Sequence, residues 1–266
     1  MQPNRKLIFI IPLLVAIISL ALFFMAVANH WFGEDVGAGA NFCEHSSGLI
    51  KQPVNTFSNF AFVIVGLLIG WDQAHGRFSK NANIITQSRF VAGFYATLAV
   101  LLGPGSMAMH ATMSAAGGFL DMLSMYLMAS FIFTFAMVRS FRWGALSFLI
   151  IFSISLAILL YINQLNYEVP FVGFIGSFFF GVFLIMAAII ELINYFIRKI
   201  QIDVRFGFAS ILLMALALFI WKMSFSGNIW CSPTSLIQGH GIWHILCAIA
   251  VYTLYRYYVS ENRTQA

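Results

Sequence analysis

The sequence has very little charge. Only 9% of its 266 residues are charged, whereas 61% are hydrophobic, and the mean hydropathy is +0.89. Soluble domains carry charge on about 25% of their residues, so this chain has too few charged side chains to cover a surface in water. It also lacks low-complexity tracts, runs of charge and obvious repeats. These absences exclude a soluble globular protein and predict a chain that is surrounded mostly by lipid.

Long apolar segments fill most of the chain. A membrane-spanning helix needs about 20 apolar residues. We identify eight such segments: Leu7–Ala28, Val54–Gly70, Phe90–His110, Gly118–Val138, Trp143–Ile162, Pro170–Tyr195, Phe206–Phe225 and Ile237–Tyr258. We therefore predict an all-α polytopic transmembrane bundle, with room for one membrane domain and little else.

The positive charges predict how these segments are oriented, because Lys and Arg concentrate in the cytoplasmic loops of membrane proteins. Only Lys51 falls outside if the N-terminus is cytoplasmic, and Lys222 lies in the seventh segment near its outer end. The other basic residues then fall on the cytoplasmic side: Arg5, Lys6, Arg77, Lys80, Arg89, Arg139, Arg142, Arg198, Lys199, Arg205, Arg256 and Arg263. We expect both termini in the cytoplasm, and the net charge of +5 reflects this topology rather than a nucleic-acid partner.

The first segment has a second interpretation. Arg5 and Lys6 precede an apolar run that ends in Ala26-Val27-Ala28, which resembles a signal peptide with its cleavage site. Because the run is longer than a usual signal-peptide core, we favour a retained helix. Cleavage would leave the other seven segments in the same orientation.

Polar residues inside the segments meet near the non-cytoplasmic face. Ser106 and His110 share a helix face at the outer end of the third segment, and Asp121 opens the fourth. His240 and His244 share a face at the outer start of the eighth. Such groups are costly in a membrane and are candidates for function. Three histidines with an open fourth position are typical of catalytic zinc sites, so we predict zinc bound by His110, His240 and His244.

Each residue also has an ordinary structural interpretation. A single histidine at a span end is usually an interfacial or packing residue, Ser106 could be a helix-packing hydroxyl, and Asp121 could hold a histidine ring through a hydrogen bond. Three histidines at one depth favour the metal site. The remaining histidines lie in loops and receive no role: His30, His45 and His75.

Two of the three cysteines lie in outer loops. Cys43 and Cys231 are both on the predicted non-cytoplasmic side, where disulfides persist. We predict that they pair and join the loop after the first segment to the loop before the eighth; the alternative is two free thiols. Cys247 lies in the eighth segment and is expected to be a small buried apolar residue.

Short motifs in this chain match those of a known family in order and spacing: Gly105-Ser106 followed by His110, Leu120-Asp121, His240-Gly-Ile-Trp-His244, Cys43-Glu44, Asn55-Thr56-Phe57-Ser58-Asn59 and Asn228-Ile229-Trp230-Cys231. On these residues the chain resembles the alkaline ceramidase family, within a wider group of adiponectin-receptor-like membrane hydrolases. The resemblance implies a seven-helix core, zinc on the three histidines, and hydrolysis of the ceramide amide bond to a sphingoid base and a fatty acid.

The resemblance also implies that Ser106 and Asp121 are the catalytic pair and that the two outer cysteines form a disulfide. The first segment is extra to the seven-helix core, so we expect an additional helix in residues 1–29 and a ceramidase-like domain in residues 30–266. Eukaryotic members share an acidic calcium-binding segment near the first cysteine. Here Glu44 is the only carboxylate left in that stretch, and calcium prefers several. We expect at most a weak calcium site at Glu44.

These residues predict a hydrolytic mechanism. Zinc lowers the pKa of a bound water to about 7, and Asp121 would accept its proton and later return one to the leaving amine. Ser106 would donate a hydrogen bond to the developing oxyanion, a contribution of about 3 kcal/mol in such sites. Lipid tails would enter from the outer leaflet. A covalent role for Ser106 with His110 as its base is disfavoured, because it leaves the other two histidines without a role.

Several other functions remain as alternatives. The nearest is a hydrolase of another lipid amide or ester, followed by a zinc-containing receptor without turnover. A metal transporter needs polar residues along a path through the membrane, and the inner half offers few, such as Glu191 and Asn194. A bis-histidine haem is weaker still, because His240 and His244 share a face. The resemblance implies a ceramide-like lipid substrate in the membrane, and the sequence identifies no particular protein partner.

Overall fold

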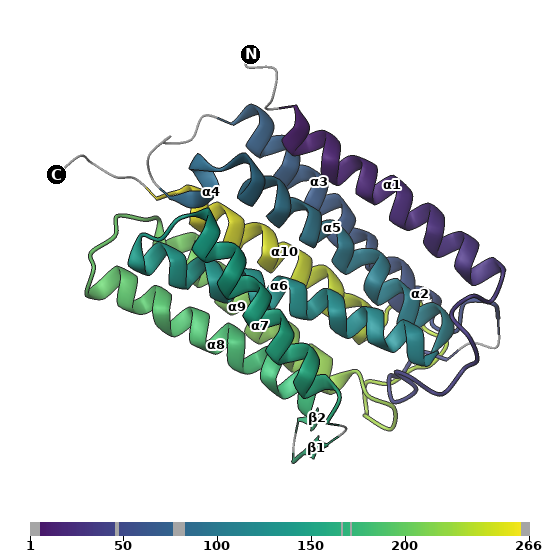
Figure 1. Ribbon diagram of the computed structural model, residues 1–266. Coiled ribbons are helices and arrows are strands. Elements are labelled where there is room, and N and C mark those ends of the chain that lie inside the picture. The colour runs from purple at the N-terminus through teal and green to yellow at the C-terminus, as the bar shows by residue number, and fades with distance from the viewer. Residues whose placement is uncertain (1–5, 46–47, 77–82, 166, 171, 262–266) are drawn as a thin grey trace.

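Long helices run side by side and make up almost all of the regular structure (Figure 1). The structure is a computed structural model that describes residues 6–45, 48–76, 83–165, 167–170 and 172–261. The helices are α1 (Leu7–Ala28), α2 (Pro53–Ser58), α3 (Phe60–His75), α4 (Ile84–Gln87), α5 (Arg89–Thr112), α6 (Ala115–Phe141), α7 (Ala145–Asn163), α8 (Ile175–Phe196), α9 (Val204–Met223) and α10 (Gly239–Val259). The all-α prediction is therefore confirmed.

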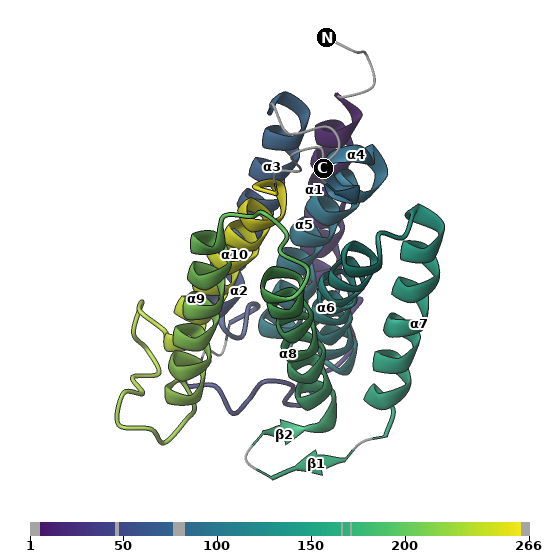
Figure 2. The same cartoon turned by 90° about the vertical axis from the view of Figure 1, so that its left-hand side faces the viewer.

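The bundle has two distinct ends. Short α4, the start of α1 and the end of α10 lie at one end, which we call the α4 end (Figures 1 and 2). At the other end lie α2, the loops around Cys43 and Cys231, and an antiparallel hairpin of β1 (Glu168–Val169) and β2 (Gly173–Phe174). We call this the disulfide end.

Within the described residues, seven helical segments are long and apolar enough to span a membrane: α1, α2 together with α3, α5, α6, α7, α8 and α9. The remaining predicted span, α10, has 21 residues and runs along the bundle but is not among them (Figure 1). Its two histidines, several tyrosines and Arg256 reduce its apolar character, and many of its residues are buried. Neighbouring helices thus replace lipid around much of α10, whereas only 6% of the α9 span is buried. The eight-span count is confirmed for seven helices and stays a prediction for α10.

Two predicted segments differ from the structure. The prediction of a helix from Pro170 is wrong, because the chain forms the β1–β2 hairpin there and α8 begins only at Ile175. Gly173 adopts a φ of +89° in the hairpin, a value that interrupts a helix. The second predicted span is divided at Asn59 and continues to His75. The other six predictions end within three residues of the observed boundaries.

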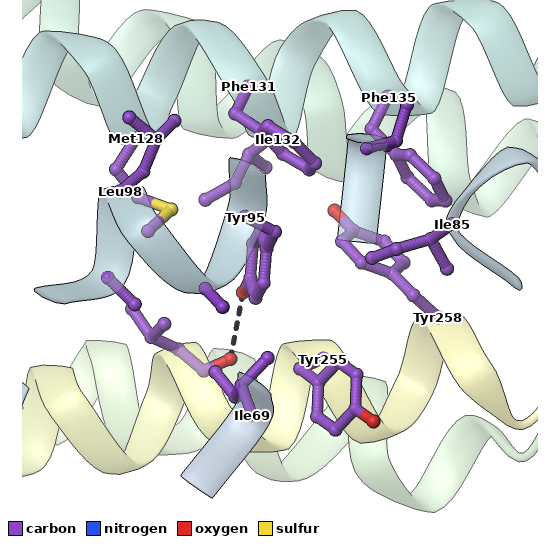
Figure 3. Close-up of a cluster of buried hydrophobic side chains, with 14 of the residues drawn as sticks. Ile69, Ile85, Tyr95, Leu98, Met128, Phe131, Ile132, Phe135, Tyr255 and Tyr258 are labelled. Carbon is purple, nitrogen blue, oxygen red and sulfur yellow. Dashed lines mark hydrogen bonds between the residues drawn. The ribbon is translucent and has the colours of Figure 1, made fainter. Parts of the chain in front are cut away.

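Aromatic packing fixes α5 against α6 and α10 in the centre of the bundle. Tyr95 of α5 is fully buried, and its ring centroid lies 4.9 Å from that of Phe131 on α6. The Tyr95 hydroxyl donates a hydrogen bond to the Val251 carbonyl oxygen of α10 over 2.8 Å, the dashed line of Figure 3. A buried hydroxyl needs such a partner. The contact therefore holds α5 and α10, the two helices that carry the predicted metal ligands, in one register.

Helices α5 and α6 approach closely at Gly105. A Cβ atom on Gly105 would lie 3.0 Å from the Leu120 carbonyl oxygen and 2.7 Å from the Cβ of Ser124. Small residues allow such close approach between membrane helices. Because Gly105 precedes Ser106 and Leu120 precedes Asp121, this approach brings the two predicted catalytic residues to the same helix interface.

Helix α1 packs on the bundle through α5 and α3. Phe23 and Val27 of α1 are buried in a cluster with Met107, Ala108 and Ala111 of α5. This packing supports the interpretation of α1 as a retained helix. The division at residue 29 into an extra helix and a separate domain stays a prediction.

Candidate metal centre

The structure brings the three predicted metal ligands together. His110 lies near the end of α5, and His240 and His244 lie in the first two turns of α10. Their ligand atoms all lie within 4.8 Å of one another. All three side chains are buried. Among the residues that the structure describes, this is the only such group of potential metal ligands.

The spacing of the nitrogens fits a zinc ion. Nε2 of His110 lies 3.1 Å from Nε2 of His240. Zinc–nitrogen bonds of about 2.0–2.1 Å in tetrahedral geometry place two ligand nitrogens roughly 3.3 Å apart. Three neutral imidazoles also leave a fourth position for water or substrate, as in catalytic zinc sites. The donor set and its spacing are therefore compatible with zinc.

Gln52 fixes the orientation of His110. Nδ1 of His110 lies 2.6 Å from Oε1 of Gln52, and the other end of the Gln52 amide donates to the Gly39 carbonyl oxygen over 2.9 Å. The amide is thus oriented with its oxygen toward the ring, so Nδ1–H donates to it. The lone pair of Nε2 then points into the cluster. A histidine that binds a metal through one ring nitrogen usually donates a hydrogen bond from the other nitrogen to an acceptor of this kind.

The junction of α2 and α3 orients His244. Its Nδ1 lies 2.8 Å from the Ser58 hydroxyl and 3.2 Å from Nδ2 of Asn59. The Ser58 hydroxyl donates to the Asn55 carbonyl oxygen over 2.9 Å. The Ser58 oxygen can therefore accept a hydrogen bond from Nδ1–H of His244, which leaves the Nε2 lone pair of that ring free. The break at Asn59 places both polar side chains against this ring.

Phe42 covers His240. The two ring centroids are 3.6 Å apart and the planes are inclined by only 25°, so the rings stack. Nδ1 of His240 is buried and has no hydrogen-bond partner among the residues described. Buried polar atoms are normally paired. Nε2 of the same ring faces His110, so a metal held by the cluster would bind Nε2 and leave this Nδ1 without a partner in the described chain.

Ser106 and Asp121 form a second polar pair beside the cluster. Ser106 lies one helical turn before His110 on α5, and its side chain contacts the carboxylate of Asp121 on α6. Both side chains are buried. The structure therefore brings these two predicted residues together, and the close approach at Gly105 explains how.

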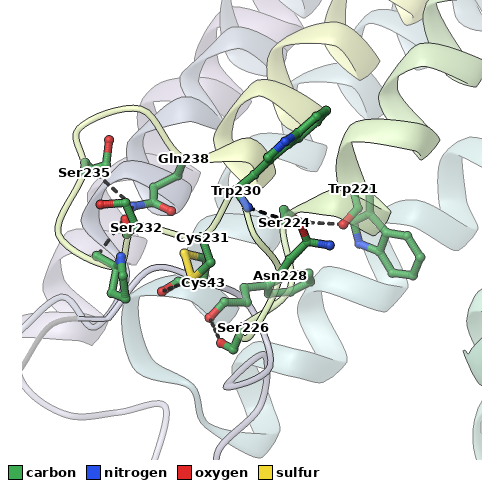
Figure 4. Close-up of a disulfide and its surroundings, with 12 residues drawn as sticks. Cys43, Trp221, Ser224, Ser226, Asn228, Trp230, Cys231, Ser232, Ser235 and Gln238 are labelled. Carbon is green, nitrogen blue, oxygen red and sulfur yellow. Dashed lines mark hydrogen bonds between the residues drawn. A yellow bond between two sulfur atoms is a disulfide. The ribbon is translucent and has the colours of Figure 1, made fainter.

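The predicted disulfide between Cys43 and Cys231 is present, and Figure 4 shows it among the loops of the disulfide end. Cys43 follows Phe42 directly, and its backbone N–H donates to the Ser224 carbonyl oxygen over 2.9 Å. The disulfide thus anchors the segment that covers the metal centre to the loop that leads into α10. Cys247 is buried, as predicted.

Glu44 caps α2 rather than lying in a group of carboxylates. Its two carboxylate oxygens accept hydrogen bonds from the backbone N–H groups of Val54 and Asn55 over 2.6 and 2.7 Å. Burial raises the pKa of Glu44, although these two donors act in the opposite direction. The contact fixes the start of α2, and with it the Ser58 and Asn59 side chains that orient His244.

Sequence reasoning missed the roles of the residues that orient the histidines. Ser58 and Asn59 entered only as part of a family motif, and Gln52 and Phe42 received no role. The signal that could have found the first two is the run of polar side chains from Asn55 to Asn59 inside an apolar segment. Nothing comparable marks Phe42, because aromatic residues are common throughout this chain.

Comparison with known proteins agrees with this geometry. The sequence model of the family described as Ceramidase matches residues 34–264, which include every residue of the candidate metal centre. The chain is also similar to a Drosophila melanogaster protein named alkaline ceramidase, with 29% identity over 231 aligned residues that cover 81% of this chain and 74% of that protein. The match extends over most of the chain from residue 34 onward, and on that evidence the chain belongs to the Ceramidase family.

Proposed function

We propose that this chain is a zinc-dependent membrane hydrolase that cleaves the amide bond of ceramide or a ceramide-like lipid, giving a sphingoid base and a fatty acid. One observation carries the proposal. Three buried histidines from α5 and α10 converge, with two Nε2 atoms 3.1 Å apart, and hydrogen bonds to Gln52 and Ser58 orient two of the rings. Membership of the Ceramidase family supports the class of substrate.

His110, His240 and His244 would hold the zinc ion. When bound, zinc supplies a Lewis acid that polarises a carbonyl oxygen and lowers the pKa of water. Gln52 and Ser58 keep two of the rings in the tautomer that presents Nε2. Phe42 excludes water from one face of the His240 ring. These contacts hold the three rings in place before an ion binds, so the site is pre-organised and does not depend on the ion to assemble it.

Asp121 and Ser106 supply the proton transfer and the hydrogen bond that amide cleavage needs. The Asp121 carboxylate would accept the proton of the attacking water and then deliver it to the nitrogen of the leaving amine. The Ser106 hydroxyl, which contacts this carboxylate, would donate to the carbonyl oxygen as negative charge develops there. Their positions next to His110 on α5 and across the α5–α6 interface support these roles.

The orientation of the bundle supports a site near the non-cytoplasmic face. The histidine cluster lies toward the disulfide end, where Lys51 is the only basic residue in the loops described. Basic residues gather at the α4 end: Lys6, Arg89, Arg139, Arg142, Arg198, Lys199, Arg205 and Arg256. Arg5, Arg77, Lys80 and Arg263 lie outside the described residues. The positive-inside rule then assigns the α4 end to the cytoplasm.

The test measures zinc and hydrolysis together. The protein is purified in detergent without chelator, and bound zinc per chain and fatty-acid release from a labelled ceramide are determined. We expect about one zinc per chain and turnover, both lost in His240→Ala. The matched control is His75→Ala, because His75 is exposed and stacks on Trp71, away from the cluster.

The outcomes separate the alternatives. Zinc without hydrolysis of ceramide would favour another lipid amide or ester, which a panel of such lipids would identify, or a receptor without turnover if none is cleaved. An intact preparation that contains no zinc and takes up none would refute the proposed metal centre.

A further inference from the structure

The loop that joins α9 to α10, residues 224–238, contains no charged side chain and no histidine. It nevertheless exposes several large apolar side chains. Ile229, Leu236 and Ile237 are 91%, 87% and 76% exposed, and Trp230 is exposed as well. Loops in water usually present polar side chains, and grouped exposed apolar side chains mark contact with a partner or a membrane. The composition of this loop therefore does not fit surroundings of water alone.

Trp230 returns from the loop to the membrane-spanning part of α9. Its ring meets that of Phe219 edge to face, with the centroids 5.9 Å apart. Phe219 lies one helical turn before Met223, the last residue of α9, and therefore roughly 6 Å inside the end of the helix. Phe219 is exposed on a helix that is hardly buried at all, and Figure 2 shows part of the loop beside the last turns of α9. The Trp230 ring thus continues the lipid-facing surface of α9.

The loop pairs polar groups of its own backbone internally. Nε2 of Gln238 donates to the carbonyl oxygens of Ser232 and Ser235 over 3.0 and 2.8 Å, and Figure 4 shows these three residues together. The Ile237 backbone N–H donates to the Ser235 hydroxyl over 3.0 Å. Unpaired backbone groups are costly where water is scarce, so an irregular segment can approach lipid only if such groups have partners. These hydrogen bonds and the disulfide of Cys231 equip the loop for that position.

We propose that this loop is embedded in the lipid leaflet at the disulfide end, at the boundary between headgroups and acyl chains. The Trp230 ring would lie at the headgroup level, where tryptophan is enriched in membrane proteins, and Ile229, Leu236 and Ile237 would contact acyl chains. The contact with Phe219 favours lipid over a second copy of the chain, because it joins the loop to a surface that already faces lipid. The proposal concerns the position of the loop and does not depend on the proposed hydrolysis.

A spin label in the loop tests this position. The full-length protein is reconstituted in phosphatidylcholine bilayers with Leu236→Cys as the labelling site, in a Cys247→Ala background that leaves the Cys43–Cys231 disulfide in place. The collision rates of the label with oxygen, which concentrates in lipid, and with a nickel chelate, which stays in water, are measured by electron paramagnetic resonance. The ratio of the two rates reports whether the label lies in lipid or in water.

Two labelled control variants provide the references. Leu216→Cys places a label on the exposed side of α9, within the span, and Glu34→Cys places one on an exposed charged position in the loop after α1. We expect the ratio of oxygen to nickel collisions for Leu236→Cys to rise well above that of Glu34→Cys, toward that of Leu216→Cys. A ratio equal to that of Glu34→Cys would overturn the proposal. Low rates of both collisions, with dipolar broadening between labels, would also overturn it and assign the loop to contact with a second copy.

A second measurement needs no label in the loop. Trp230→Phe removes one fluorophore and keeps an aromatic ring against Phe219, so the difference between its fluorescence and that of the unsubstituted protein reports on Trp230. Both proteins are reconstituted in phosphatidylcholine with bromine on the part of the acyl chain next to the headgroup. We expect this lipid to quench the Trp230 contribution, and aqueous iodide to leave most of it unquenched. Quenching by iodide alone would place Trp230 in water and overturn the proposal.

Discussion

Gln52 and His110 are joined by two hydrogen bonds. The backbone N–H of Gln52 donates to the His110 carbonyl oxygen over 3.0 Å, and Nδ1 of the His110 ring lies 2.6 Å from the side-chain oxygen of Gln52. The loop before α2 therefore fixes both the end of α5 and the ring that α5 presents. Orientation of the first metal ligand depends on a segment 58 residues earlier in the chain.

Gln52→Leu is expected to weaken zinc binding without unfolding the bundle. Loss of the partner that orients a metal-binding histidine typically reduces metal affinity about 10- to 100-fold. Zinc affinity is measured by competition with a chromophoric chelator. Gln52→Glu, which keeps an acceptor oxygen, should retain tight binding.

The matched control for that experiment is Gln73→Leu. Gln73 is a buried glutamine on α3 that is absent from the metal centre, and its Nε2 has no hydrogen-bond partner among the described residues. The Gln73→Leu variant should leave the zinc affinity unchanged. If Gln52→Leu and Gln73→Leu lose zinc affinity equally, Gln52 acts only by stabilising the fold and not by orienting His110.

Ser106→Ala and Asp121→Asn are expected to reduce hydrolysis while zinc remains bound. Removal of one hydrogen bond to a developing oxyanion reduces kcat about 10²- to 10³-fold. Removal of a general base reduces it about 10²- to 10⁴-fold. Both kcat and zinc content are measured. Ser130→Ala is the control, because Ser130 is buried on α6 without a hydrogen-bond partner among the described residues. Loss of zinc from Asp121→Asn would instead indicate a role in holding the site together.

Removal of the Cys43–Cys231 disulfide is expected to affect both stability and metal retention. The bridge joins residues 188 positions apart, and loss of a native disulfide costs about 2–5 kcal/mol. Because Phe42 precedes Cys43 and stacks on His240, zinc should also dissociate faster. A variant with serine at both positions is compared with Cys247→Ala, by thermal unfolding and by transfer of zinc to a chelator. An unchanged rate of zinc transfer would show that Phe42 keeps its position without the bridge.

Arg139→Met is expected to destabilise the α4 end. Arg139 pairs with Glu191 on α8 and with Glu261 beyond α10, and its side chain is completely buried. Truncating one member of a buried ionic network leaves unpaired charges and costs about 3–5 kcal/mol. The control is Arg205→Gln, whose ion pair with Asp203 is exposed on the arginine side and should contribute little to stability because water screens it. Chemical unfolding in detergent measures both. If Arg139→Met lowers the free energy of unfolding as little as Arg205→Gln does, the buried ionic network does not stabilise the α4 end.

Features that depend on the local pattern of residues, such as helix bounds and residues that share a helix face, could be predicted from the sequence. Leu7–Ala28 matches its helix at both ends because a run of 22 residues in which Ser19 is the only polar one allows few other structures in a membrane. His240 and His244 were paired by their spacing alone, since residues four apart share a helix face. The partner on α5 followed from the predicted topology, which placed His110 at the same depth.

Features that depend on contacts between distant residues were not predictable in this way. The Gln52–His110 hydrogen bond and the stacking of Phe42 on His240 join separate segments, and neither leaves a periodic signal. The β1–β2 hairpin was mistaken for helix because Val169 to Phe174 is as apolar as the helix that follows. Hydropathy measures burial in lipid and does not distinguish backbone conformations over so short a segment.

The position of the ligands along the chain has a consequence for biogenesis. His110 is synthesised 130 residues before His240, so the histidine cluster cannot form until α10, the last helix of the described chain, has entered the bundle. With its histidines and tyrosines, α10 is less apolar than the other long helices, and many of its residues are buried against them. Uptake of the proposed metal would therefore be coupled to the arrival of α10. A chain arrested before that step would carry His110 but no complete coordination shell, and it would expose no prematurely active site.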